Sequence, residues 1–161
     1  MDFVKVLLGI VAFEGLILYI QNKGFLDDFE TTRMTLFLLL FSTSLLIVVQ
    51  NSIYISKERS VLNRDFFSGL SRSAFAFASM GIHAFFAVLE TIVFILSYSV
   101  FSKFFDKDFP DAGHIFGSYR WEVGITVLLV FLASHFIALF ISALVGKSEI
   151  TSVILAVVVG I

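Results

Sequence analysis

Four side chains that can carry charge lie inside long apolar runs of this sequence: Glu14, His83, Glu90 and His135. A carboxyl or imidazole group in such surroundings is energetically costly and usually faces a cavity or a partner group. His83 and Glu90 are seven residues apart, so on a helix they share one face. Together with a water molecule they could relay protons or line a polar substrate path. Alternatively, these side chains make hydrogen bonds between helices. We favour that alternative for His83 and His135, and for Glu90 both remain open.

The sequence gives only weak indications of metal binding or phosphate binding. The His residues show no paired spacing, so no zinc site is predicted, and the absence of Cys excludes disulfides and thiolate metal sites. The motif "GKSE" at 146–149 resembles part of a phosphate-binding loop, but Ile141 stands where that loop needs a glycine. We therefore predict neither an enzyme nor a cofactor on this chain. A net charge of −2 gives no indication of nucleic acid binding.

The elements that position these residues follow from composition. The chain has 161 residues, 58% of them hydrophobic and only 15% charged, with 21 Phe, one Pro and a mean hydropathy of +0.99. Soluble domains carry about one quarter charged residues, and a chain of this size could not bury so much apolar surface in one core. The composition therefore predicts an all-α, polytopic integral membrane protein.

The apolar runs give the expected spans. A helix needs about 20 apolar residues to cross the hydrocarbon core of a bilayer. We expect four transmembrane helices at about 3–21, 34–55, 74–101 and 123–145, and the start of a fifth at 151–161. Because the last segment would reach only about halfway across, we expect 1–161 to be one transmembrane domain, truncated within its fifth span.

The hydrophilic stretches alternate between the two sides of the membrane. Residues 22–33 and 102–122 fall on one side, and residues 56–73 and 146–150 fall on the other with the N-terminus. Lys57, Arg59, Arg64 and Arg72 crowd into the 56–73 loop. Because cations favour the cytoplasmic side, we expect this loop and the N-terminus in the cytoplasm, with the protein in the cell (inner) membrane.

The 56–73 loop also has a helical pattern. Leu62, Phe66 and Leu70 recur at every fourth position, which predicts one apolar stripe of a short amphipathic helix. Gly69 can end that helix, and Ser71 or Ser73 can cap the next one. The cations could meet phosphates of membrane lipid. Alternatively, the helix docks a cytoplasmic partner, with Phe66, Phe67 and Leu70 as candidate anchors.

The segment "KERSVLNRDFFSGLSRSAFAFAS" resembles a loop of type-2 ABC exporter permeases, especially of the ABC transporter G (White-like) group and its bacterial relatives. The pairs Lys57-Glu58 and Arg64-Asp65 stand where that loop carries lysine-glutamate and arginine-glutamate. Gly69-Leu70-Ser71 and Ala74-Phe75 stand at its glycine-leucine-serine and alanine-tyrosine positions. "VVQNSIYISKE" and "LFISALVGKSEIT" are similar to the family's approach to the loop and to its fourth span. Asp65, Phe75 and Arg72 depart from the family's usual glutamate, tyrosine and frequent proline.

This resemblance implies a mechanism. In that family the loop is a coupling helix that docks on a cytoplasmic ABC ATPase, which holds ATP and Mg²⁺, and the permease pairs with a second copy or a paralogue. The residues that it implies in coupling are Lys57, Glu58, Arg59, Arg64, Asp65, Phe66, Phe67, Gly69 and Leu70. The family's second and fifth spans line the path, which implies Thr43, Ser44, Gln50 and Asn51 as candidates beside the intramembrane Glu14, His83 and Glu90.

Two other functions remain open at the level of sequence. The chain could be a non-transporting membrane adaptor whose charged loop docks a soluble partner. It could also be a proton-coupled secondary transporter that uses Glu14 and Glu90 as proton carriers.

Overall fold

The computed structural model describes residues 3–21, 28–106, 115, 117–145 and 149–160, and for 54–60, 149, 150, 152, 159 and 160 it describes the backbone alone. The described residues form α1 (Phe3–Ile20), α2 (Phe29–Asn51), α3 (Tyr54–Phe67), α4 (Arg72–Phe104), α5 (Tyr119–Leu144) and α6 (Glu149–Gly160), with no strand among them. Four of these helices, α1, α2, α4 and α5, are long and apolar enough to cross a membrane. The prediction of an all-α polytopic membrane protein is confirmed.

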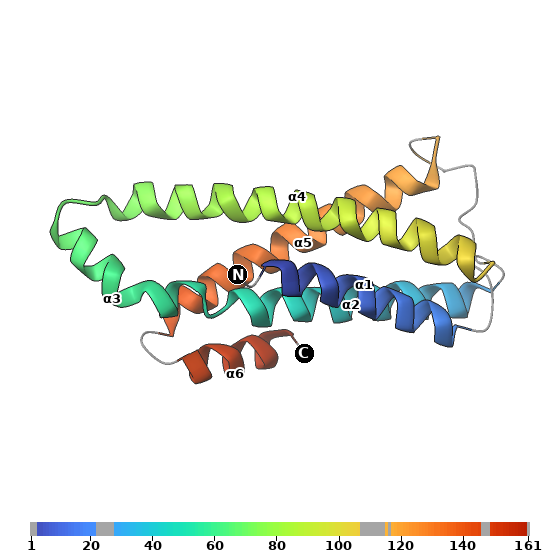
Figure 1. Cartoon of the computed structure of the whole chain (residues 1–161), viewed down its shortest axis with the longest axis horizontal. Helices are drawn as coiled ribbons and strands as arrows, with labels where there is room; N and C mark the ends of the chain where they lie inside the picture. Colours follow the sequence, from blue (N-terminus) through green and yellow to red (C-terminus); the bar gives the residue numbers. More distant parts are fainter. Residues whose placement is uncertain (1–2, 22–27, 107–114, 116, 146–148, 161) are drawn as a thin grey trace.

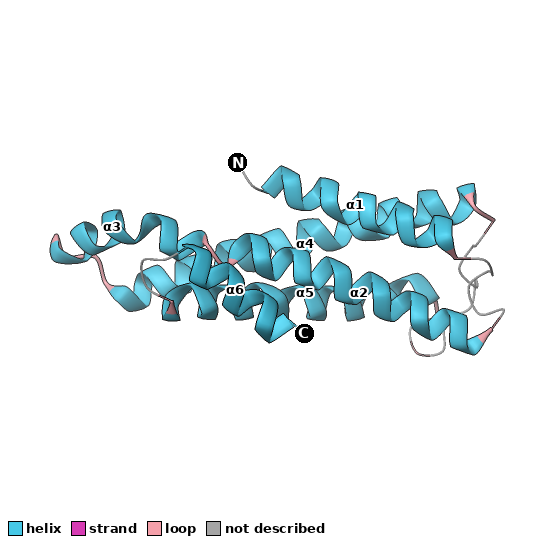
Figure 2. Cartoon of the chain, turned by 90° about the horizontal axis from the view of Figure 1, so that it is seen from below, coloured by secondary structure: helices cyan, strands magenta, loops and turns pink. Residues whose placement is uncertain are grey.

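The four long helices form a bundle (Figure 1). In this bundle α1 packs against α2 and α4, and α5 packs against the same two helices from the other side. The short helix α6 lies outside the bundle against α2 and α5 (Figure 2). The chain reverses direction between α1 and α2 and between α4 and α5 at one end, while α3 lies at the other end. The bundle therefore has two distinct ends, as the predicted alternation of loops requires.

Three of the four spanning helices, α2, α4 and α5, extend beyond the predicted spans, and α5 begins at Tyr119 rather than at 123. Helix α2 begins at Phe29 rather than at 34, and Thr31 Oγ1 donates to Asp28 Oδ2 over 2.8 Å at its start. Glu30 and Arg33 in this added turn are exposed and lie 3.9 Å apart. Helix α4 has 33 residues, so it is about 50 Å long and exceeds the roughly 30 Å of hydrocarbon. Hydropathy marks only the part of a helix that lies in lipid, and these polar extensions fall outside it.

The interior is built from one face of each long helix. On α1 the buried residues Val6, Ile10, Glu14 and Leu18 recur at every fourth position. They meet the buried residues of the other helices in one core, whose members include Leu39, Ile47, Ala87, Phe94, Tyr98, Val127 and Phe131. A second, smaller cluster of Val48, Ala138, Ile141 and Ala156 joins α2, α5 and α6.

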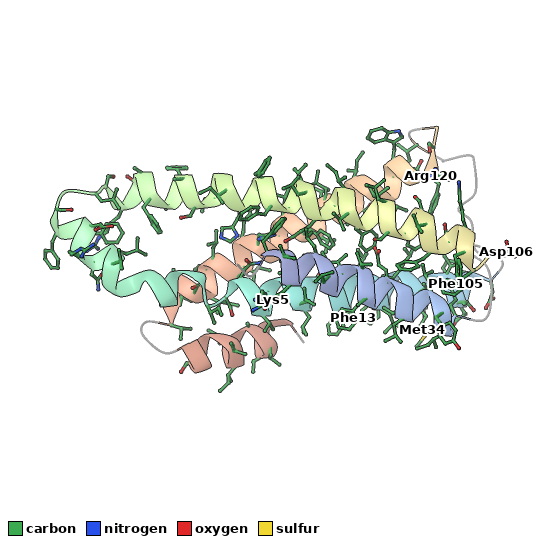
Figure 3. The ribbon with its side chains drawn as sticks, viewed as in Figure 1. Lys5, Phe13, Met34, Phe105, Asp106 and Arg120 are labelled. Carbon is green, nitrogen blue, oxygen red and sulfur yellow. The ribbon has the colours of Figure 1, made fainter. Side chains whose placement is uncertain are left out.

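The outer surface is also apolar. Phe13 and Met34 lie on the outside of the bundle (Figure 3), and Met34, Leu8 and Phe85 are 65%, 65% and 60% exposed. Soluble monomers rarely expose continuous apolar patches of this kind. Lipid is the surrounding that accommodates such a surface, which agrees with the four spanning helices.

Candidate functional site

The first candidate site is the α3–α4 hairpin, which we define as residues 61–80. Helix α3 ends in a Schellman motif, in which Leu70 N–H donates to Asp65 O over 3.0 Å and Gly69 N–H donates to Phe66 O over 3.2 Å. Gly69 has a φ of 109°, a backbone conformation that glycine adopts readily because it lacks a Cβ. Ser71 Oγ then accepts the N–H of Ala74 over 3.4 Å and caps α4. The expected helix end at Gly69 and cap at Ser71 both occur.

Aromatic contacts hold the two arms of the hairpin together. The Phe66 and Phe75 rings meet edge to face, with centroids 6.0 Å apart, and the Arg72 guanidinium lies 5.6 Å from the Phe66 ring centroid. Leu62 is buried and Phe66 half-buried, as the predicted stripe requires. Leu70, the third predicted member of that stripe, follows the end of α3 and is 41% exposed, because the turn at Gly69 stops the helix first.

The other face of the hairpin carries exposed groups. Phe67 is 94% exposed, which is the highest value among the exposed large apolar residues of the described chain. Arg64 Nε lies 3.7 Å from Asp65 Oδ1, with the two side chains 80% and 44% exposed. Such a surface pair contributes little to stability, at most about 1 kcal/mol. These side chains are therefore available to a partner.

Lys57, Glu58 and Arg59 lie in α3, but their side chains fall outside the described residues. The backbone of α3 also contacts α5 and α6. A displacement of α3 would therefore be transmitted to three helices: α4 through the hairpin, and α5 and α6 by direct packing.

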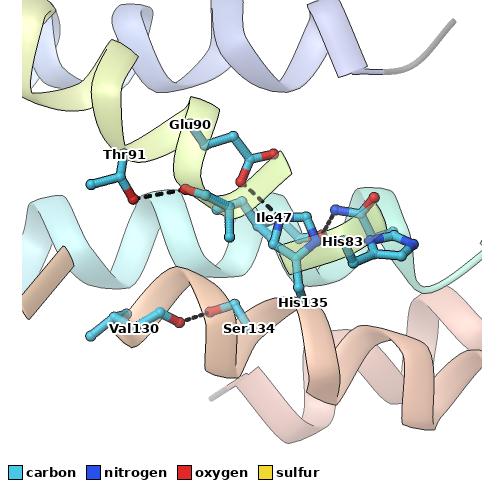
Figure 4. A network of polar contacts seen from close by, with 9 residues as sticks. Ile47, His83, Glu90, Thr91, Val130, Ser134 and His135 are labelled. Carbon is cyan, nitrogen blue, oxygen red and sulfur yellow. Dashed lines mark hydrogen bonds and ion pairs between the residues drawn. The ribbon is translucent and has the colours of Figure 1, made fainter. Parts of the chain in front are cut away.

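The second candidate site is a polar triad in the bundle interior, which consists of Glu90 and His83 from α4 and His135 from α5. His135 Nε2 lies 2.8 Å from Glu90 Oε2, and His135 Nδ1 lies 3.0 Å from His83 Nδ1 (Figure 4). All three side chains are at most 2% exposed. Since a hydrogen bond between two Nδ1 atoms needs a proton on one of them, the triad holds a shared proton away from water.

The structure thus brings His83 and Glu90 to one face of α4, as their spacing predicts, but it places His135 between them. The sequence pattern does not join His135 to these two residues. It shows an imidazole in an apolar run of α5, whereas the acid that this imidazole meets is 45 residues away in α4. Only the packing of α4 on α5 decides that pairing.

Glu14 belongs to a separate contact between α1 and α4. The Ser97 hydroxyl donates to Glu14 Oε2, and within the described chain Glu14 Oε1 is buried without a hydrogen-bond partner. Gly15, the next residue, lets the two helices approach closely: a Cβ built there would lie 3.1 Å from Phe101 Cζ. The buried carboxyl groups Glu14 and Glu90 therefore have different partners.

The polar candidates on α2 are dispersed. Thr43 is buried, and its hydroxyl donates over 2.6 Å to Leu39 O in its own helix. The half-buried Asn51 donates through Nδ2 to Ile47 O over 2.9 Å, and Gln50 is half-buried as well. Ser44 Oγ is buried without a hydrogen-bond partner in the described structure. Thr43 and Asn51 thus donate to carbonyl groups of α2 itself.

The described residues contain no cluster of three or more His, Cys, Asp or Glu that could hold a metal ion. The triad has two imidazoles and one carboxyl group, which contact one another directly, while Glu90 Oε1 is buried without a hydrogen-bond partner in the described structure. Its chemistry is hydrogen bonding and proton sharing between α4 and α5.

Comparison with known proteins identifies the family. The family model described as "ABC-2 type transporter" matches residues 3–161, which is almost the whole chain. No curated protein and no solved structure matches it.

Proposed function

Because the chain belongs to the ABC-2 type transporter family as a membrane-embedded permease component, we propose that it exports its substrate with energy from ATP received through α3. The hairpin end of the bundle faces the cytoplasm, and residues 57–71 form the docking surface for an ABC ATPase. ATP and Mg²⁺ bind on that ATPase, which is a separate chain or domain. A second permease copy or a paralogue completes the transporter.

The observation that carries this proposal is the exposed Phe67 on a hairpin that is fixed to the bundle. An aromatic ring that is 94% exposed gains most from burial in a partner's pocket. Beside it, Arg64 and Asp65 offer one charge of each sign at the rim. An apolar anchor with a charged rim is the usual composition of a protein interface.

The hairpin can also transmit force. Phe66 is held to α4 through Phe75 and Arg72, so α3 cannot move without the start of α4. Helix α4 runs on through the whole bundle and carries His83 and Glu90 at its centre. A push on α3 by the ATPase would therefore tilt or slide α4 against α5, which is a rigid-body shift between two packed states.

The two alternatives from sequence differ from this proposal in testable ways. An adaptor would bind its partner without moving a substrate. A proton-coupled carrier would depend on Glu14 and Glu90, whose contacts with Ser97 and His135 are compatible with a structural role instead. Family membership favours the ATP-driven function over both.

The test compares two exposed phenylalanines at opposite ends of the molecule. Phe67 ends α3 at the hairpin, and Phe104 ends α4 and is 79% exposed. Phe67→Asp is expected to abolish co-purification of the ATPase and to reduce ATP-driven transport at least about tenfold, because one interface anchor contributes more than about 1.4 kcal/mol. Phe104→Asp should leave both properties intact. Retention of the ATPase by Phe67→Asp, or equal losses in both variants, would contradict the proposal.

A further inference from the structure

A cleft of about 570 Å³ lies between α3, α4 and α5 at the hairpin end of the bundle. We propose that this cleft binds a membrane phospholipid with an anionic headgroup, whose phosphate contacts Arg72 and whose acyl chain lies between α4 and α5. The proposed function assigns the outer face of the hairpin to the ATPase. The cleft lies under α3 and is lined by other side chains of that segment than the exposed Arg64, Asp65 and Phe67, so it is a second site.

The α4 wall of the cleft is a single helical stripe. Arg72, Phe75, Ala76, Ser79 and Met80 line it, at the spacing that places residues on one face of a helix. The stripe is ordered along the helix axis, with its cation at the first residue of α4 and Met80 about 12 Å further on. The wall is thus charged at its outer end and apolar at its inner end, which matches the polarity of a lipid.

The α5 wall has the same periodicity. Phe136, Leu139, Phe140 and Ala143 line the cleft from the last turns of α5. Phe140 and Phe136 are 64% and 41% exposed, so the cleft opens along an apolar surface rather than into a sealed core. In a membrane-spanning segment, that surface faces hydrocarbon, and an acyl chain can enter from the side.

Helix α3 closes the cleft with Leu62, Asn63 and Phe66. No acidic residue is among the described residues that line the cleft. In the described chain Arg72 has no ion-pair partner, and its guanidinium lies over the Phe66 ring instead of on a carboxylate. A cation at the mouth of an apolar cleft, without a counter-charge of its own, is complementary to a phosphate whose tail fills the cleft.

The chemistry and the position of the cleft favour a lipid over a segment of a protein partner. The cleft combines one anion-binding group with walls that continue into the lipid-facing surface. Lipid is the amphiphile present at this depth at high concentration, and its headgroup lies at the level where a helix leaves the hydrocarbon. Arg72 is the first residue of a helix that is longer than the membrane is thick.

The experiment measures lipid binding to the full chain, purified with its ATPase where the two co-purify. The protein is reconstituted in nanodiscs of phosphatidylglycerol and phosphatidylcholine and released from them under mild conditions. Native mass spectrometry then measures the mass of the complex, which gives the number of retained lipids. We expect one phosphatidylglycerol to be retained in preference to phosphatidylcholine. Arg72→Gln should weaken that binding about fivefold, the effect of one cation on an anionic lipid.

Two further variants test the contribution of the acyl chain to lipid binding and control for a general effect of charge. Ala76→Trp fills the apolar wall without changing charge, and it should also displace the lipid. Arg120→Gln removes an exposed cation at the opposite end of the bundle (Figure 3) and should leave retention unchanged. If Ala76→Trp lowers the yield of folded protein, Ala143→Phe provides the same steric test from α5.

Thermal unfolding gives an independent readout. Added phosphatidylglycerol should raise the melting temperature of the unsubstituted protein and of Arg120→Gln, but not that of Arg72→Gln. Equal retention of phosphatidylglycerol by Arg72→Gln, or equal stabilisation by phosphatidylcholine or inorganic phosphate alone, would overturn the lipid assignment. A disulfide between two chains through Met80→Cys, formed in preference to lipid binding, would show that a second copy occupies the cleft.

These results can be told apart from a failure of the proposed function. Lipid retention is measured without ATP or substrate, so it can succeed even if Phe67→Asp proves harmless. Conversely, a chain that binds its ATPase through Phe67 and retains no lipid would disprove the inference about the cleft alone.

Discussion

His135 Nε2 lies 2.8 Å from Glu90 Oε2, and the two buried side chains join α5 to α4. His83 contacts the opposite ring nitrogen of His135. When His135 carries its proton on Nε2, it donates that N–H to Glu90 Oε2. The contact has the geometry of a strong interhelical hydrogen bond at the centre of the bundle.

Removing the acceptor should destabilise the bundle. Glu90→Leu leaves the His135 N–H buried without a partner, and we expect a loss of about 1–2 kcal/mol in the free energy of unfolding. The double variant Glu90→Leu with His135→Phe should recover part of that loss, since both polar partners are then replaced by apolar groups. Denaturation of the detergent-solubilised protein measures both values. If the loss of stability in the double variant equals the sum of the losses in the two single variants, the two residues are not coupled.

A second substitution of Glu90 distinguishes a structural role of this residue from a role as a proton carrier. Glu90→Gln keeps an oxygen that can accept the His135 N–H but removes the titratable group. We expect ATP-driven transport to remain within about twofold of the unsubstituted protein, because no proton has to leave this site. Transport is measured in proteoliposomes with and without an imposed proton gradient. Loss of transport in Glu90→Gln, together with a requirement for the gradient, would favour a proton-coupled carrier.

Glu14 gives a contrasting prediction on the other side of the bundle. Its Oε2 accepts from Ser97, while Oε1 is buried without a hydrogen-bond partner in the described structure. Glu14→Gln keeps an acceptor for Ser97 and removes the cost of a buried carboxyl group. We therefore expect the stability in detergent to stay the same or to rise by up to about 1 kcal/mol. Glu14→Leu also abolishes the Ser97 contact and serves as the comparison. A clear loss of stability in Glu14→Gln would indicate that the charge itself is needed.

Substitution by alanine should change the free energy of unfolding in opposite directions at two glycines in and beside the hairpin. Gly69 has a φ of 109°, so Gly69→Ala strains the turn and should cost more than about 1 kcal/mol. Gly81 lies inside α4 with open space where a Cβ would point, so Gly81→Ala should stabilise the helix by about 0.5–1 kcal/mol.

Only the Gly69 variant should also reduce ATP hydrolysis coupled to transport, because its turn fixes the direction in which α3 leaves α4. Unfolding curves and hydrolysis rates of the two purified variants test this pair. Equal effects of Gly69→Ala and Gly81→Ala on ATP hydrolysis would show that the geometry of the turn does not affect coupling.

Sequence predicts those features of this protein that depend on local chemistry. Hydropathy locates the four spans because lipid selects on composition over a whole helix. The turn is predictable because Gly69 and Ser71 act on their immediate neighbours. In contrast, the contact between His135 and Glu90 depends on the rotation and register of α4 against α5, which no local pattern encodes. The cleft under α3 is equally invisible, since it arises from stripes on three helices that meet only in the folded chain.

A crosslink shows whether residues 57–71 dock an ATPase. The chain has no Cys, so Ser68→Cys introduces one thiol immediately after α3, and Ile115→Cys places a matched exposed thiol near the start of α5. After crosslinking in native membranes, the attached peptides are identified by mass spectrometry. We expect a peptide from an ATP-binding domain on Ser68→Cys and none on Ile115→Cys. Efficient labelling of Ser68→Cys that yields only peptides of this chain or lipid adducts would contradict it.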